Sequence, residues 1–278
     1  MIRTASEQDV PALKQLFATC FNDTDDDFLN SFFNDYFSTT TGMVAIRDKR
    51  IAAMLFLCPA TMKVNGIIRT LYYVYACGTL PEYRGLGLMK QLLETAFDYA
   101  KQQNSWGLLL VPAEKPLFGY YGKLGFGFFS SLKEKDIKPD KISQPFFSPY
   151  QISPDEAAAI RARRFDGDYQ VQWDAAHIAF SASIADLPGG GLVGVQRGNG
   201  QNDYALCEKN ETGLRVKETS VEEELLPQLS AFLQEQFAVA TTRFYLPSID
   251  KEPFSMAKPV NPLSLPPQGL PYFNLDMG

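Results

Sequence analysis

The sequence has little of what metal-dependent or nucleophilic catalysis requires. It contains a single histidine, His177, so a Ser-His-Asp triad or a Cys-His dyad would have to use it, and a site with several histidine ligands cannot form. The absence of any CxxC spacing argues against a Cys-only metal site or a redox dithiol, although there are four cysteines, Cys20, Cys58, Cys77 and Cys207. We therefore expect any enzyme of this sequence to work without a metal and without a catalytic histidine.

Long apolar runs and basic charge are also lacking. The longest apolar run, residues 51–58, is far shorter than the roughly 18 residues of a membrane span, and the first residues do not resemble a signal peptide. Scattered cysteines in a chain of 278 residues are typical of free thiols, so we expect a cytoplasmic protein with no membrane segment. With 32 acidic and 26 basic residues the net charge is −6, which argues against nucleic-acid binding.

Hydrophobic periodicity predicts a mixed α/β protein. In the first half it indicates helices near 10–21, 26–37, 88–100 and 116–124, and strands near 43–46, 51–63, 67–80, 106–111 and 126–132. An Asn-Gly pair at positions 65 and 66 predicts a hairpin turn. In the second half it indicates helices at 154–165, 173–187 and 222–237, and strands at 192–196, 204–209, 214–219 and 242–246.

The length suits two domains better than one. Three prolines, Pro139, Pro145 and Pro149, interrupt a stretch with little periodicity, so we place a boundary near residue 145. The predicted domains are residues 1–145 and residues 146–278, and the second, smaller one ends in a proline-rich tail.

The most informative stretch, residues 84–90, ends a strand, forms a glycine turn and opens a helix. The first N–H groups of a helix lack internal partners, and the helix dipole favours an anion there. Gly85 and Gly87 would let a phosphate approach the backbone, and Arg84 adds a positive charge. A purely structural turn explains these residue types equally well. The P-loop pattern is absent, and the dinucleotide pattern GxGxxG fails because position 90 is Lys.

Two motifs resemble the GNAT superfamily of N-acetyltransferases. Arg84-Gly85-Leu86-Gly87-Leu88-Met89 is similar to the signature Arg/Gln-x-x-Gly-x-Gly/Ala, from which Met89 departs. Tyr121-Gly122-Lys123-Leu124-Gly125-Phe126 is similar to the second motif, Tyr-x-Lys/Arg-x-Gly-Phe. The resemblance covers about residues 1–135. The remainder resembles the enhanced-intracellular-survival-type branch, in which a degenerate GNAT-like domain follows the catalytic one, and we expect that branch's third domain to be absent.

The resemblance implies a GNAT fold, with a mixed, mostly antiparallel, splayed sheet flanked by helices, followed by a second, smaller GNAT-like α/β domain. It implies that acetyl-CoA binds between the strands at 72–80 and 106–111, with the pantetheine arm on the first strand and the pyrophosphate on the glycine turn. The implied cofactor-binding residues are Cys77, Gly78, Thr79, Arg84, Gly85, Leu86, Gly87, Leu88, Met89 and Lys90. An amine would attack the thioester directly, without a covalent intermediate, which agrees with the single histidine.

Proton transfer needs an acid for the leaving thiolate and a base for the amine. Tyr121 matches the acid position of the family, and its neighbour Tyr120 is the alternative. For the base we consider Glu82, acting through water, and the terminal carboxylate of Gly278. We interpret Cys77 as a small buried residue rather than a nucleophile, and we expect His177 to have a surface or capping role.

The acceptor is the least specified partner. The acidic residues Asp23, Asp25, Asp26 and Asp27 form either a solvated turn or a funnel for a cationic amine. We expect the aromatic residues Phe28, Phe32, Phe33 and Tyr36 to divide between the core and an acceptor pocket. A small-molecule amine such as an aminoglycoside or polyamine, and a peptidyl lysine, all stay open, as does a homo-oligomer. The rival function is a non-catalytic acyl-CoA-binding regulatory or interaction module.

Overall fold

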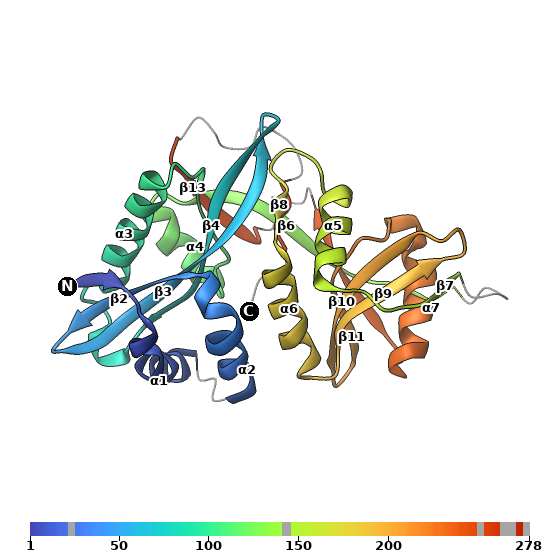
Figure 1. Cartoon of the computed structure of the whole chain (residues 1–278), viewed down its shortest axis with the longest axis horizontal. Coiled ribbons are helices and arrows are strands. Elements are labelled where there is room, and N and C mark those ends of the chain that lie inside the picture. Colours follow the sequence, from blue (N-terminus) through green and yellow to red (C-terminus); the bar gives the residue numbers. More distant parts are fainter. Residues whose placement is uncertain (22–25, 141–145, 249–252, 262–270, 275–278) are drawn as a thin grey trace. The chain divides into compact units, whose positions relative to one another are not determined.

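The computed structural model describes residues 1–21, 26–140, 146–248, 253–261 and 271–274. The chain divides into two compact units (Figure 1), of which the first contains Met1–Phe129 and the described residues 253–261. The second contains the described residues 130–248 and 271–274. The change from the first unit to the second falls within one strand, and the domain boundary near residue 145 stays a prediction.

The first unit is built on a sheet in which the neighbouring strands described are antiparallel, except for one parallel pair. Its strands, in spatial order, are β1 (Ile2–Thr4), β2 (Thr41–Arg47), β3 (Arg50–Val64), β4 (Ile67–Thr79), β5 (Gly107–Leu110) and β13 (Ser255–Pro259). Positive φ angles of 52° at Asn65 and 76° at Gly66 make the predicted hairpin turn between β3 and β4. The parallel pair is β4 with β5.

Helices cover both faces of this sheet. They are α1 (Val10–Phe21), α2 (Asp26–Asn30), the π-helical η2 (Ser31–Tyr36), α3 (Leu88–Gln102) and α4 (Lys115–Lys123), with short 3-10 turns η1 (Glu7–Asp9), η3 (Phe37–Thr39) and η4 (Pro81–Tyr83). Neighbouring residues of β3 point to opposite faces. Leu55 and Leu57 pack with the buried stripe of α3, whereas the Phe56 ring lies 5.0 Å from that of Phe32 in η2.

The single helix predicted over 26–37 was wrong in detail, since it is a succession of α, π and 3-10 turns. Aromatic packing accounts for this stretch, because Phe28, Phe32, Phe33 and Tyr36 are all buried. The Phe32 ring also lies 5.4 Å from that of Tyr75 in β4. All four of these aromatic residues, which we expected to divide between the core and an acceptor pocket, are thus buried.

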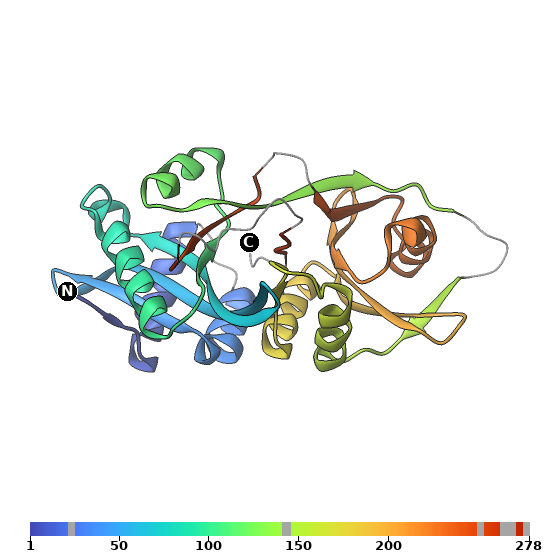
Figure 2. The same ribbon diagram turned by 90° about the horizontal axis from the view of Figure 1, so that it is seen from above.

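The proline-rich tail contributes a strand that the sequence pattern did not reveal. Strand β13 pairs antiparallel with β5, and Met256 lies opposite Leu110. The dark red strand lies among the elements of the first unit, far in the sequence from its neighbour (Figure 2). A Cβ on Gly107 would come within 2.3 Å of the Lys258 carbonyl oxygen, so this close pairing requires glycine at position 107.

The second unit has a comparable sheet. Its strands, in spatial order, are β6 (Gly127–Asp136), β12 (Thr242–Ser248), β11 (Gly213–Thr219), β10 (Asn202–Asn210), β9 (Gly191–Arg197) and β7 (Phe147–Tyr150). Its helical elements are α5 (Pro154–Arg164), α6 (Ala175–Asp186), η5 (Glu223–Leu225) and α7 (Leu226–Phe237), and β8 (Val171–Gln172) is a short additional strand. Among its described strands, β11 and β12 pair in parallel, and α7 lies between them in the sequence.

The predicted fold class is therefore confirmed: each unit has a mixed, mostly antiparallel sheet with flanking helices. Within the part of the chain that the structure describes, no helix is long and apolar enough to span a membrane.

Candidate functional site

Strands β4 and β5 splay apart at the predicted cofactor site. Their parallel pairing consists of Tyr72 with Leu108 and Tyr73 with Leu109, while β4 continues to Thr79. A bulge lies within this extension: Gly78 pairs with Met54 and Tyr75 with Phe56, and Ala76 takes a φ of 49°. The end of β4, including Cys77, Gly78 and Thr79, thus has no strand paired on its β5 side among the described residues. It is an open edge to which an extended amide chain could bind.

The glycine turn follows this open edge. Gly85 and Gly87 have φ angles of 78° and 74°, which L-residues with a Cβ rarely adopt. A Cβ on Gly85 would meet nothing within 4 Å, and one on Gly87 would meet only the Gln91 side chain at 4.0 Å. The left-handed backbone therefore requires glycine here, and the space outside the turn is open.

Helix α3 begins directly after Gly87 without a side-chain cap. The N–H groups of its first residues, Leu88, Met89 and Lys90, have no acceptor inside the helix. They form the positive end of a helix of 15 residues, beside an exposed turn. This arrangement suits an anion such as a pyrophosphate.

Arg84 connects the turn to the end of the strand. Its Nε donates to the Thr79 carbonyl oxygen at 3.1 Å. The guanidinium also lies beside the Cys20 thiol. Burial raises the pKa of that thiol above its ordinary value, and the charge of Arg84 opposes the rise. The charge of Arg84 is therefore held where β4 ends and the turn begins.

Tyr121 lies against the bulge of β4. It is 7% exposed, whereas Tyr120 is 37% exposed. The Tyr121 hydroxyl lies beside the Cys77 thiol. Repulsion between the two groups if both ionised, together with burial, raises the pKa of Tyr121 well above its ordinary value, and burial raises the pKa of Cys77 to about 12. Both groups therefore carry their protons at neutral pH.

Of the two candidate bases, the structure describes Glu82. Glu82 is exposed in η4, with its carboxylate 3.8 Å from the Arg50 guanidinium. It lines a separate cavity of about 460 Å³ together with residues of α1 and the β2–β3 turn. Gly278 lies outside the described residues, as do Asp23 and Asp25. The structure thus brings Tyr121 and the end of β4 together and places Glu82 beside Arg50.

His177 is fully buried in α6 of the second unit, so the expected surface role was wrong. Its ring stacks on that of Trp173, with centroids 3.6 Å apart. Its backbone N–H donates to the capping carboxylate of Asp174. The imidazole is therefore packed on an aromatic ring inside the second unit.

The second unit repeats the splay but fills it with its own chain. Pairing of β11 with β12 stops at Val216 and Phe244, although both strands continue, and Lys217 is an extra residue in the pairing with β10. The Asn274 side chain donates to the Lys217 carbonyl oxygen at this bulge. The described C-terminal segment, residues 271–274, therefore occupies the end of β11.

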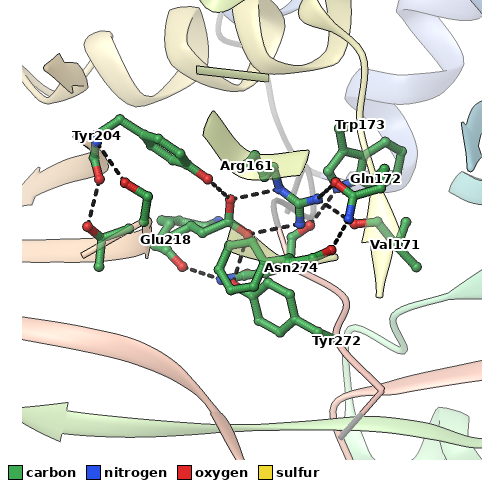
Figure 3. Close-up of polar contacts among 12 residues, drawn as sticks. Arg161, Val171, Gln172, Trp173, Tyr204, Glu218, Tyr272 and Asn274 are labelled. Carbon is green, nitrogen blue, oxygen red and sulfur yellow. Dashed lines mark hydrogen bonds and ion pairs between the residues drawn. The ribbon is translucent and has the colours of Figure 1, made fainter. Parts of the chain in front are cut away.

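A buried ion pair holds this segment (Figure 3). The Glu218 carboxylate accepts hydrogen bonds from Arg161 at 2.9 and 3.1 Å, from the Tyr204 hydroxyl at 2.5 Å and from the Tyr272 hydroxyl at 2.8 Å. Both charged side chains are 0% exposed. Burial and the charge of Glu218 raise the pKa of both tyrosines. This network was not predicted from the sequence, because its residues come from separate elements and form no helix or strand pattern.

Comparison with known proteins agrees with this geometry. Residues 1–129 match the family model described as an acetyltransferase (GNAT) domain. No curated protein matches the sequence. Among solved structures, a conserved protein from Enterococcus faecalis V583, described as a probable N-acyltransferase, is similar with a TM-score of 0.75 and 13% identity over 94% of this chain and 72% of that one.

Two further structures share the fold of the whole chain. Eis1 from Mycobacterium abscessus gives a TM-score of 0.72 at 13% identity, over 94% of this chain and 74% of that chain. A GCN5-related N-acetyltransferase from Anabaena variabilis gives 0.71 at 17% identity, over 94% and 73%. The predicted resemblance of the first half to GNAT acetyltransferases agrees with the family match over residues 1–129, and the three solved structures share the fold.

Proposed function

We propose that the first unit moves an acetyl group from acetyl-CoA to a primary amine. The match of residues 1–129 to an acetyltransferase (GNAT) domain supports acyl transfer as the reaction. One observation carries the proposal: the open end of β4 leads into the glycine turn on one side and contacts Tyr121 on the other. A strand edge, an anion-binding helix start and a protonated hydroxyl are what a CoA thioester requires.

The residues divide the work as follows. The backbone of Cys77, Gly78 and Thr79 pairs with the amide groups of the pantetheine arm. The backbone N–H groups of residues 85–90 bind the pyrophosphate. Arg84 adds a positive charge at the end of the strand. This places the thioester near the bulge of β4.

The amine attacks the thioester carbon directly, and CoA leaves as a thiolate. Tyr121 is the acid at the leaving sulfur: its raised pKa keeps the hydroxyl protonated at neutral pH, so it can donate a hydrogen bond to the developing thiolate. A thiol with a pKa of about 12 is a poor nucleophile at neutral pH, which supports transfer without an acetylated Cys77. Glu82, through water, or the terminal carboxylate of Gly278 would take the proton from the amine.

We assign a single acyl-CoA site to the chain. The second domain, predicted as residues 146–278, is on this proposal a degenerate GNAT-like copy, because residues 271–274 cover the end of β11 where the first unit leaves β4 open. The acceptor is a small-molecule or peptidyl amine, and a cytoplasmic location follows from the sequence prediction. Homo-oligomers stay open.

The test is thiol release from acetyl-CoA with an aminoglycoside, a polyamine and a lysine peptide as acceptors. We expect Tyr121→Phe to lower kcat by about 100-fold with little change in KM for acetyl-CoA. Tyr120→Phe is the matched control, since the Tyr120 ring lies 5.2 Å from that of Tyr121. This substitution should leave kcat within about twofold of the wild-type value.

Two outcomes would replace the proposal. Tight acetyl-CoA binding without turnover on any amine would favour the non-catalytic binding module. Failure to bind acetyl-CoA would exclude both functions. Removing residues 275–278 distinguishes the two candidate bases. An unchanged kcat would exclude the terminal carboxylate as the base.

A further inference from the structure

A second cavity in the first unit, of about 370 Å³, is lined by three lysines from three different elements. Lys90 comes from the first turn of α3, Lys123 from the end of α4 and Lys258 from β13. Glu94 is the one carboxylate in the lining, and its Oε1 lies 3.9 Å from the Lys90 Nζ. The cavity therefore carries more positive than negative charge.

Lys258 is the most constrained of the three. Its Nζ lies 4.3 Å from the centroid of the Phe97 ring, and the Nζ of Lys101 lies 4.6 Å from the same centroid. Burial and the charge of Lys101 lower the pKa of Lys258, although the charges of Glu94 and Asp98 oppose this. Within the described residues Lys258 forms no ion pair with a carboxylate. An anion in the cavity would relieve this concentration of positive charge.

The Lys258 side chain lies against Gly125 at the cavity. A Cβ on Gly125 would lie 3.4 Å from the Lys258 Cε and 3.7 Å from its Nζ, so the ammonium group passes directly over this glycine. The φ of Gly125 is 88°, which also favours glycine. The tail lysine therefore lies against the turn after α4, and it lines the same cavity as Lys123.

We propose that this lysine pocket binds the 3′-phosphate of the CoA nucleotide, with Lys258 as its principal contact. The inference rests on the proposed use of acetyl-CoA. CoA carries a pyrophosphate and, one ribose away, a 3′-phosphate monoester. Lys90 belongs to both sites, since its N–H lies in the anion-binding first turn of α3 and its side chain lines the cavity. A pyrophosphate on the turn would therefore bring the 3′-phosphate to the three ammonium groups, which suit a compact dianion.

The consequence is a cofactor contact from outside the matched domain. Lys258 lies in β13, beyond residues 1–129, and reaches the pocket because β13 pairs with β5. The tail segment thus discriminates CoA from its dephosphorylated form.

The experiment compares the Kd of acetyl-CoA and 3′-dephospho-acetyl-CoA by isothermal titration calorimetry. For the wild-type chain we expect the dephosphorylated compound to bind about tenfold or more weakly, as the loss of a charge-assisted contact predicts. Lys258→Ala should weaken acetyl-CoA binding by about tenfold and leave the Kd of 3′-dephospho-acetyl-CoA unchanged. Lys123→Ala tests the same contact from a different element, and circular dichroism checks the fold of each variant.

Lys101→Ala is the matched control, because Lys101 contacts the same ring but does not line the cavity. It should retain the preference for acetyl-CoA. Equal wild-type Kd values for the two compounds, or equal weakening of both by Lys258→Ala and Lys123→Ala, would overturn the 3′-phosphate assignment and leave the proposed function standing. Binding of neither compound would overturn both.

Discussion

Replacing Glu218 with glutamine tests how the second unit holds the chain's C-terminal segment. The substitution keeps the shape of the side chain but removes the negative charge opposite Arg161, which is 0% exposed. Four hydrogen bonds reach the carboxylate, two from Arg161 and one each from Tyr204 and Tyr272. A neutral amide can accept at only one of its two terminal atoms, so some of these donors lose their acceptor.

The expected cost follows from the burial of both charges. Removing one partner of a buried ion pair leaves an uncompensated charge and costs about 3–5 kcal/mol. A folded unit is stabilised by only about 5–15 kcal/mol, so the change is a large fraction of the total. With an m-value of roughly 2 kcal/mol/M, the urea midpoint of the second unit should fall by about 2 M.

The two tryptophans allow each unit to be followed separately. Trp106 lies in the first unit and Trp173 in the second, where its indole N–H donates to the Asn274 carbonyl oxygen at 2.8 Å. In a Trp106→Phe background, fluorescence reports the unfolding of the second unit beside the network. In a Trp173→Phe background it reports the first unit, whose midpoint should not change.

Asp136→Asn is the matched control, since Asp136 forms a two-point pair with Arg243 at 2.7 and 3.0 Å on the surface. It should change the midpoint little, because exposed pairs are screened by solvent. A midpoint shift for Glu218→Gln no larger than that of the control would refute the reasoning. So would a failure of Arg161→Met to recover part of the lost stability in the Glu218→Gln variant, because that change removes the uncompensated cation.

Three further outcomes follow from the first unit. Gly87→Ala should raise KM for acetyl-CoA severalfold in steady-state assays and cost roughly 1–2 kcal/mol of stability in unfolding assays. Gly66 has a similar φ of 76° in a hairpin, so Gly66→Ala should lower stability without changing KM. Cys77→Ala should retain kcat within a few fold, and mass spectrometry of the wild-type enzyme during turnover should detect no acetylated Cys77. Because the pKa of Tyr121 is raised, its proton is lost only above its ordinary range, so kcat should show no fall due to Tyr121 as pH rises from 7 to about 10; a Tyr121-dependent fall near pH 8 contradicts this.

Local sequence patterns predicted much of the fold. The apolar stripe of α3 was predicted from its spacing, and Leu88, Leu92, Leu93, Ala96 and Ala100 are buried. The hairpin at Asn65-Gly66 and the glycine turn are set by conformations that few residues adopt, so they can be read from sequence. Side-chain period and turn chemistry are local, which is why these elements were found.

The missed features depend on contacts between distant residues. Strand β13 lies in a proline-rich stretch and forms because it pairs with β5, more than a hundred positions earlier. Arg161 and Glu218 are 57 positions apart, and neither helix nor strand periodicity predicts a buried charge. The contact of Tyr121 with Cys77 likewise requires α4 to lie on the bulge of β4. The motif favoured Tyr121 and left Tyr120 as the alternative, and the structure shows that Tyr121 is the more buried of the two.

The most direct test of the account is the number of acetyl-CoA molecules bound per chain, measured by native mass spectrometry of the full-length protein. The account predicts one, bound at the open end of β4 and its glycine turn, because residues 271–274 cover the corresponding position of the second unit. This single molecule should be lost from Gly87→Ala more readily than from Gly66→Ala. A chain that binds none, or two with the second unaffected by Gly87→Ala, would contradict it.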